Sequence, residues 1–321
     1  MTSNRKPTVW ILTDGKAGDE QPLIGIAEAL GVEPQLRRVR PRKPFTWLMP
    51  WGPIDPRDAP KRPGSPIEPP FPDICLATGR RAVAYLRTLK SASPKTLTVF
   101  FKDPRTKSHG ADLIIVQRHD EMLGDDALQV TTAPNRLPAS RLEAIRQAPP
   151  HDLAALPHPR IAVLVGGNSR HHEFTASDID RLIDGLSLRL SAGFSLMITA
   201  SRRTPDTLKT RLDMLADQDA VQYWTGEGEN PLAAYLALAD EVIVTADSTN
   251  MVGDAATTGK PIQVFHPTGG HPKINRFIEA LKGEVTIGTF PDGPASGDYP
   301  PVNSTALIAD NILSRLRTLA S

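Results

Sequence analysis

Residues 241–265 combine a buried strand, a polar turn and a helix in an order that suits anion binding. The apolar runs at residues 241–245 and 261–265 are β-branched and too short for helices. We therefore expect two strands with a helix at residues 250–258 between them. Asp247 and Ser248 lie in the turn that opens this helix. The first N–H groups of a helix and its dipole attract negative charge, so the turn is a candidate phosphate site.

Helix capping is the competing explanation for the polar residues of this turn. Asp and Ser cap helices without binding any ligand, and for Asp247 and Ser248 alone capping is the simpler interpretation. Asp254 favours a ligand, because it falls on the same helix beside Gly253 and two alanines. Small neighbours allow a close approach, and a carboxylate there can accept hydrogen bonds from a ribose diol.

A second glycine-containing turn, Gly-Gly-Asn-Ser at residues 166–169, follows the strand predicted at residues 160–165 and could present backbone amides to a diphosphate. Arg202 could neutralise phosphate, whereas Arg203 is interpreted equally well as a surface residue. The candidate ligand-binding set is Gly166, Gly167, Asn168, Ser169, Arg202, Gly226, Glu227, Asp247, Ser248, Asp254, Lys273 and Arg276.

The segment from Ala-Asp at residues 239–240 to Gly-Lys-Pro at residues 259–261 resembles the nucleotide-sugar half of GT-B glycosyltransferases, such as the lipid-linked N-acetylglucosaminyltransferase of peptidoglycan synthesis. The resemblance places the acid of that family at Asp254, where the family more often has Glu. In similar enzymes the loop that corresponds to residues 224–230 presents main-chain groups to the base. The resemblance implies an α/β fold of two Rossmann-like domains facing a cleft, with the donor in the second domain.

An inverting transfer also needs a base within reach of the acceptor hydroxyl. Asp14, Asp19, His119 and Asp120 compete for this catalytic role, since they follow predicted strands of the first half of the chain. Parallel strands place such residues at one edge of the sheet. The sequence does not choose among the four. Its histidines lack metal-ligand spacing, so no metal site is expected.

Four further segments resemble a second family. They are DGKAGDEQPLIGIAEALG at residues 14–31, ATGRRAVAYLR at 77–87, FFKDPR at 100–105 and VQRHD at 116–120. They are similar to the mitochondrial-fission factor family, known in plants as the elongated-mitochondria protein, and the likeness covers nearly the whole chain. That family often has His or a small residue where this chain has Asp19, so a histidine role is not carried over. The plant members are associated with recruiting a dynamin-like GTPase, which implies an adaptor function.

Composition limits the classes of partner and compartment. The 321 residues are 40% hydrophobic and 23% charged, which is enough for two globular α/β domains. A net charge of +1 gives no global field for nucleic acid, so no nucleic-acid partner is expected. Cys75 is the single cysteine and cannot form an internal disulfide. With neither a secretory signal nor a spanning apolar stretch, the expected location is cytoplasmic, with peripheral membrane association left open.

Proline marks the expected domain organisation. Residues 149–159 are predicted to be a linker between an N-terminal, acceptor-side domain at 1–150 and a nucleotide-sugar-binding domain at 159–302. Residues 303–321 are expected to form a final helix that crosses to the first domain. Residues 40–72 hold 11 of the 31 prolines, which excludes a regular helix or central strand and predicts an insertion.

The start of this insertion is both basic and aromatic. Such a mixture suits a membrane interface or a lipid-linked acceptor, although a proline-stiffened loop whose tryptophans pack on their own domain explains it equally well. The residues concerned are Arg37, Arg38, Arg40, Arg42, Lys43, Phe45, Trp47, Leu48, Met49 and Trp51.

Three functions stay open from the sequence. The favoured one is a metal-independent glycosyltransferase that needs no cofactor and takes a nucleotide-sugar donor, with helix N-termini and cationic side chains offsetting the charge of the leaving diphosphate. A non-catalytic adaptor related to fission factors is the first alternative. A nucleotide-sugar epimerase, which uses the same two-domain architecture, is the second. The oligomeric state is not indicated.

Overall fold

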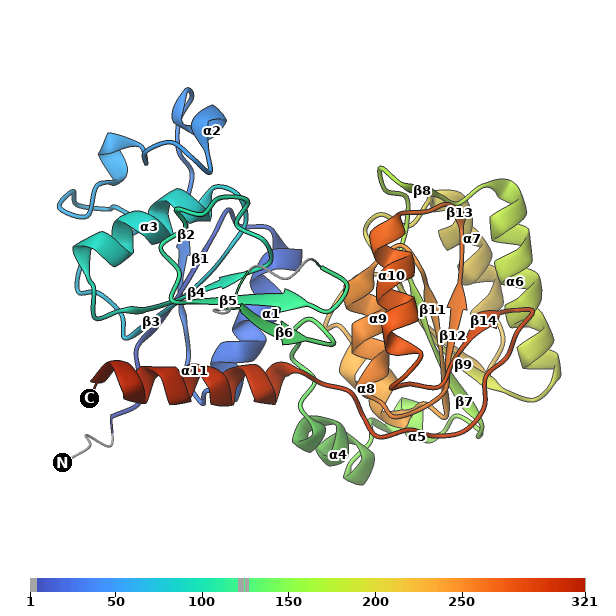
Figure 1. The fold of residues 1–321 in the computed structure, drawn as a ribbon. Helices are drawn as coiled ribbons and strands as arrows, with labels where there is room; N and C mark the ends of the chain where they lie inside the picture. Colours follow the sequence, from blue (N-terminus) through green and yellow to red (C-terminus); the bar gives the residue numbers. More distant parts are fainter. Residues whose placement is uncertain (1–4, 121–123, 125–126, 321) are drawn as a thin grey trace. The chain divides into compact units, whose positions relative to one another are not determined.

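The computed structural model describes residues 5–120, 124 and 127–320, and the chain forms two compact units (Figure 1). The first unit comprises Met1–Arg136 with Ser304–Ser321, and the second comprises Leu137–Asn303. Each unit contains a six-stranded sheet in which all neighbouring strands are parallel. The predicted fold class, two Rossmann-like α/β domains, is confirmed.

The first sheet has the strand order β2-β1-β3-β4-β5-β6. Its strands are β1 Val9–Thr13, β2 Gln35–Arg38, β3 Ile74–Thr78, β4 Leu97–Phe101, β5 Leu113–Gln117 and β6 Ala127–Val130. Strands β1, β3 and β4 are buried along their whole length. This is why they are continuous apolar runs, since a central parallel strand is covered on both faces.

Helices cover the two faces of this sheet. On one face α1 (Ala17–Ala29) and α11 (Thr305–Ala320) lie side by side and bury Ile26 and Ile308 against the strands (Figure 1). On the other face α3 (Ala82–Ala92) packs with Trp10 and the buried Met49 of the insertion.

The proline-rich insertion carries little regular structure, as expected. It contains α2 (Phe45–Leu48) and a 3-10 helix (Pro56–Asp58). Asp55 is 1% exposed and organises the insertion. Its carboxylate accepts hydrogen bonds from Nε and Nη2 of Arg42, both at 2.8 Å, and from the Arg57 amide at 3.1 Å. These donors, with the Arg42 guanidinium first among them, hold the pKa of Asp55 far below its usual range.

The second sheet has the strand order β10-β9-β7-β11-β12-β14. Its strands are β7 Arg160–Val165, β9 Ser195–Ala200, β10 Val221–Trp224, β11 Glu241–Thr245, β12 Ile262–Phe265 and β14 Ile287–Phe290. Its helices are α4 Ala139–Gln147, α5 His151–Ala154, α6 Ala176–Ser191, α7 Asp206–Leu215, α8 Leu232–Leu238, α9 Thr249–Ala256 and α10 Pro272–Leu281. Two further strands, β8 His172–Glu173 and β13 Thr268–Gly269, pair antiparallel.

Two apolar clusters flank the second sheet. Helices α6 and α7 supply one cluster through Leu182, Leu186 and Leu212. Helices α4, α8, α9 and α10 supply the other, in which Val252 and Phe277 are buried. No helix within the described residues is both long and apolar enough to span a bilayer.

The division between the units differs from the expected linker. Residues 149–159 lie inside the second unit, where they include α5, and the units divide between Arg136 and Leu137. Helix α4 therefore belongs to the second unit, because its Leu142 is buried against that unit's apolar cluster. Proline content does not report which core a neighbouring helix packs against. Helix α11 belongs to the first unit.

Gly25 gives a test of how tightly α1 is packed in the first unit. A Cβ atom at Gly25 would lie 2.2 Å from the carbonyl oxygen of Asn135, whereas a Cβ at Gly18 on the same helix would meet nothing within 4 Å. We expect Gly25→Ala to lower the free energy of unfolding by about 1–3 kcal/mol. Gly18→Ala should leave it unchanged or raise it by about 0.5–1 kcal/mol. Urea unfolding of both variants measures the difference, and equal effects would contradict the packing described.

Candidate functional site

The second sheet reverses its direction of winding between β7 and β11. From β7 the chain continues through β9 to β10 on one side, whereas β11, β12 and β14 follow on the other side. The crevice outside the carboxyl ends of the strands at such a point is where open α/β sheets bind ligands. The turns that follow β7 and β11 therefore lie at the expected position of a ligand site.

Asp247 ties these two turns together. Its side chain is 0% exposed, and its carboxylate accepts hydrogen bonds from Thr245 Oγ1 at 2.6 Å and from the Gly167 amide at 3.1 Å. Arg203, which follows β9, completes the cluster through an ion pair of 3.0 Å. Three turns at the carboxyl edge are thus fixed by one buried carboxylate, whose charge is balanced by the guanidinium.

The glycines at residues 166 and 167 serve this packing. A Cβ atom on Gly166 would lie 2.0 Å from Oδ1 of Asp247, and one on Gly167 would lie 2.1 Å from the backbone of Arg203. The four amides of the turn are also engaged within the protein. Gly166 donates to Thr245 Oγ1, Gly167 to Asp247, Asn168 to the Arg203 carbonyl and Ser169 to the His172 carbonyl. In this conformation the turn has no amide left for the diphosphate that the sequence suggested there.

The two neighbouring arginines differ in their contacts, and only Arg203 departs from what the sequence suggested. Arg203 reaches back to Asp247 and to the Asn168 carbonyl at 3.2 Å, so it is part of the fold and not only a surface residue. Arg202 is exposed, and within the described residues it makes no recorded hydrogen bond or ion pair. The Arg202 guanidinium is therefore the one available to an external anion.

The N-terminus of α9 has two backbone N–H groups that are not hydrogen-bonded to any described residue. Ser248 caps the helix by accepting a hydrogen bond from the Met251 amide at 3.4 Å. The amides of Thr249 and Asn250 donate to no residue that the structure describes. Both residues are partly exposed. Capping and anion binding are therefore compatible here, because the cap satisfies one amide and leaves two at the positive end of the helix.

Asp254 lies one and a half turns further along α9. It is partly buried, and burial raises its pKa to about 7. Its carboxylate has no hydrogen bond or ion pair to a described residue, in contrast to the paired carboxylate of Asp247. Asn250 stands four residues earlier, on the same face of the helix, and its side-chain amide also makes no recorded contact. Sequence reasoning missed Asn250, although its i,i+4 spacing from Asp254 could have indicated it.

The other predicted ligand-binding residues are less close to this point. Gly226 and Glu227 follow the edge strand β10, three strands or roughly 14 Å from β11. Their loop is held by the Trp224 indole N–H, which donates to the Glu227 carbonyl. Lys273 and Arg276 lie on α10, which packs against α9. Arg276 is exposed there, which leaves it accessible to a ligand.

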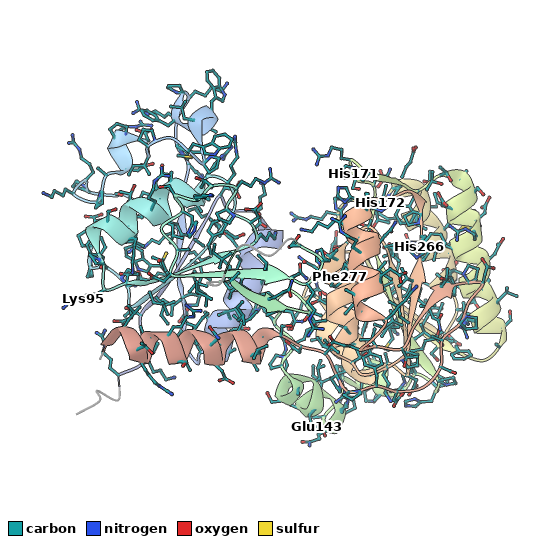
Figure 2. All side chains as sticks on the ribbon, viewed as in Figure 1. Lys95, Glu143, His171, His172, His266 and Phe277 are labelled. Carbon is teal, nitrogen blue, oxygen red and sulfur yellow. The ribbon has the colours of Figure 1, made fainter. Side chains whose placement is uncertain are left out.

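Histidines gather at the same end of the second unit. His171 and His172 follow β7, and His266 follows β12 (Figure 2). The ring centroids of His171 and His271 are 4.4 Å apart. The pKa of His172 and of His266 is lowered, chiefly by burial, so the neutral form is favoured at both. In the described chain, no three His, Cys, Asp or Glu side chains are grouped so that they could hold a metal ion.

A pocket of about 410 Å³ opens elsewhere, between α10 and β14. His266, Asn275 and Thr289 line it, and Lys282 in its wall pairs with Glu279 at 2.6 Å. None of its lining residues comes from α9 or from the turn after β7. The unengaged polar groups lie at the sheet reversal and not in this pocket.

The candidate bases lie in the first unit and differ in accessibility. Asp14, directly after β1, pairs with Lys16 at 3.1 Å, while its Oδ1 is buried without a hydrogen-bond partner in the described chain. Asp19 accepts from Lys102 Nζ at 2.9 Å. Lys102 itself adopts φ +75° directly after β4, a conformation that costs a long side chain free energy and often occurs near functional sites.

The remaining two candidates are close together. The His119 side chain is 0% exposed, and its Nε2 lies 3.8 Å from Oδ1 of Asp120. A ring this deeply buried is poorly placed to meet an acceptor hydroxyl from solvent. The geometry therefore disfavours His119, and the three aspartates, whose side chains are 10–19% exposed, stay candidates.

Comparison with solved structures shows the fold. A putative UDP-N-acetylglucosamine 2-epimerase from Listeria monocytogenes superposes with a TM-score of 0.53 and 11% identity, covering 97% of this chain and 87% of its own. Os79 from O. sativa, solved in complex with UDP, gives a TM-score of 0.51 at 12% identity, with 98% and 94% covered. The S. aureus MnaA–UDP co-structure gives 0.51 at 10% identity, with 97% and 90% covered. The expected GT-B-like organisation is thereby confirmed.

Sequence comparison identifies relatives. The mitochondrial fission protein ELM1 of Arabidopsis thaliana is 28% identical over 273 residues, which cover 76% of this chain and 64% of the plant protein. The chain thus matches less than two thirds of that relative's length. The family model described as Mitochondrial fission ELM1 matches residues 17–316. With nearly its whole length matched, and with the segments at residues 14–31 and 77–120 that resembled this family, the chain belongs to the mitochondrial fission ELM1 family.

Proposed function

We propose that the second unit binds a nucleotide-sugar, with the diphosphate at the N-terminus of α9. The observation that carries this proposal is the set of unengaged groups at the sheet reversal: the amides of Thr249 and Asn250 and the carboxylate of Asp254. Solved proteins with the same fold, Os79 and MnaA, hold UDP. At such low sequence identity these structures support the fold alone. The argument for the ligand comes from the side chains of this chain.

Each group has a chemical role in this proposal. The two free amides and the helix dipole bind phosphate oxygens, and Ser248 holds the helix end in place. Asp254 accepts hydrogen bonds from the ribose hydroxyls. Its raised pKa fits a carboxylate that is desolvated without a partner of its own and gains one when the ligand binds. Arg202 and Arg276 are exposed cations that can offset phosphate charge.

The reaction we propose is glycosyl transfer without a bound metal. Helix N-termini and guanidinium groups aimed at the departing diphosphate can stabilise its charge in the transition state. The acceptor is assigned to the first unit, whose sheet edge carries Asp14 and Asp19. Asp14 and Asp19 are both kept as candidate bases, since their side chains are 10% and 19% exposed.

An adaptor function is the second candidate, and one specific observation favours it. The Arabidopsis relative is named a mitochondrial fission protein, and the family model matches nearly the whole chain. A pure adaptor would not need an unpaired, desolvated carboxylate on α9. The epimerase alternative draws on the fold alone, which is similar to that of solved UDP-N-acetylglucosamine 2-epimerases such as the Listeria protein.

Replacement of Asp254 tests the ligand site. We expect the wild-type chain to bind UDP-N-acetylglucosamine at pH 8, and Asp254→Asn to weaken binding by about 1.5–3 kcal/mol, because hydrogen bonds to a charged acceptor are lost. Asp217→Asn, an exposed aspartate of the same unit without a recorded partner, is the matched control and should bind as wild type does. Isothermal titration calorimetry with UDP, ADP and GDP as further probes measures the affinities.

The outcomes separate the candidate functions. Equal binding by wild type and Asp254→Asn would remove Asp254 from the site while leaving the helix N-terminus in place. If wild type binds none of these nucleotides at millimolar concentration, the adaptor function is favoured.

The same substitution should have the opposite effect on stability. A carboxyl whose pKa is near 7 in the folded chain and about 4 when unfolded opposes folding increasingly as pH rises through that range. Asp254→Asn should therefore raise the free energy of unfolding at pH 8 by about 1–2 kcal/mol, a value reduced for partial solvent screening. Near pH 4 the gain should vanish. Chemical unfolding at both pH values checks this, and a loss of stability at pH 8 would show that Asp254 has a partner in the fold.

A further inference from the structure

In the proline-rich insertion, three large apolar side chains are exposed within the five-residue stretch 47–51. Trp47 is 65% exposed, Leu48 48% and Trp51 67%. They lie on and just after α2, which Figure 1 shows at an outer end of the first unit, beyond α3. Single exposed apolar residues are ordinary on a protein surface, but three within five residues, two of them tryptophans, indicate a contact surface.

The backbone beneath these side chains is fixed. Arg80 donates to the Met49 carbonyl at 3.0 Å and to the Thr46 carbonyl at 3.1 Å. Arg87 donates to the Gly52 carbonyl at 2.6 Å. Met49, between the exposed residues, is 0% exposed and anchors the segment in the core. The tryptophans therefore do not pack on their own domain, which was the alternative left open by the sequence, even though the loop that carries them is tightly held.

The exposed charged side chains around this group are positive. Residues 40–62 contain six Lys and Arg and two Asp. Both acids are paired within the unit, since Asp55 is bound by Arg42 and Arg57, and Asp58 accepts a hydrogen bond from the hydroxyl of Tyr85 on α3. Arg40, Lys43, Lys61 and Arg62 remain exposed, and Lys43 lies 5.5 Å from the ring of Trp47. The outward surface is cationic although the whole chain carries a net charge of only +1.

From this arrangement we propose that the surface formed by Trp47, Leu48 and Trp51 with Arg40 and Lys43, here called the Trp47–Trp51 surface, docks on an anionic lipid bilayer. Tryptophan places its apolar ring among the acyl chains and its N–H among the headgroups, while neighbouring basic side chains pair with anionic headgroups. A second copy of this chain is a poor occupant, because it would bring like charges face to face. The surface lies in the first unit and is independent of the nucleotide site on α9.

The test uses the full chain and sedimentation with two kinds of vesicle, phosphatidylcholine alone and phosphatidylcholine mixed with phosphatidylglycerol. Wild type should bind the anionic vesicles, which contain phosphatidylglycerol, and should not bind the zwitterionic vesicles of phosphatidylcholine alone. Trp47→Ser with Trp51→Ser should reduce binding at least roughly tenfold. Arg40→Gln with Lys43→Gln should reduce it about 25-fold, at roughly fivefold for each of the two charges, and the loss should shrink in high salt.

Matched controls remove similar groups elsewhere. Leu188 and Met214 are 68% and 64% exposed in the second unit, so Leu188→Ser with Met214→Ser removes comparable apolar area. Lys95→Gln with Arg317→Gln removes two exposed positive charges of the first unit. Both controls should bind anionic vesicles as wild type does.

Fluorescence gives a second readout that does not depend on sedimentation. Of the four tryptophans, Trp10 is 2% exposed and Trp224 lies at the end of β10 in the second unit. A blue shift of tryptophan emission on adding anionic vesicles that is lost in the double serine variant therefore comes from Trp47 and Trp51. The proposal is overturned if wild type binds neither vesicle, if it binds both equally, or if the controls lose as much binding as the test variants. Self-association of wild type that the double serine variant abolishes, without vesicle binding, would assign the surface to a protein contact instead.

Discussion

One buried carboxylate holds together the three turns at the carboxyl edge of the second sheet. It is bound by a threonine hydroxyl, a glycine amide and an arginine. Asp247 accepts from Thr245 and Gly167 and pairs with Arg203. The first unit repeats the arrangement: Glu20 accepts from Thr13 at 3.0 Å and pairs with Arg38 at 2.8 Å, and the Gly15 amide donates to Thr13. In both units the turn after a central strand is set by charge pairing in a desolvated place, where a missing partner would cost several kcal/mol.

This constraint separates structural polar groups from available ones. The carboxylate of Asp247 and the amides of residues 166–169 are occupied by the fold, so they position neighbours and have nothing left for a ligand. The N-terminus of α9 is held by the same cluster but keeps two free amides, and Asp254 keeps a free carboxylate. A desolvated charge without a partner lowers stability, and proteins accept such a cost mainly at functional sites.

Much of the fold could be predicted because it depends on local patterns. The apolar runs at residues 160–165 and 241–245 form strands with the predicted bounds. The family was indicated by short segments at strand ends. The division between the units could not be read from proline, since it depends on which core Leu142 joins. Nor could the sequence show that Arg203, and not Arg202, reaches Asp247, because adjacent side chains differ only in the direction the turn gives them. Exposure of Trp47 and Trp51 likewise depends on packing that composition does not encode.

The central claim is that the N-terminus of α9 is the anion site of the second unit. Hydrogen–deuterium exchange of the full chain, with and without UDP-N-acetylglucosamine, tests it most directly, because bound phosphate would protect amides that now lack an acceptor. We predict slower exchange in the peptide that contains Thr249 and Asn250, and little change in the peptide around residues 166–169, whose amides are already bonded. Protection confined to residues 166–169, with α9 unchanged, would contradict the claim.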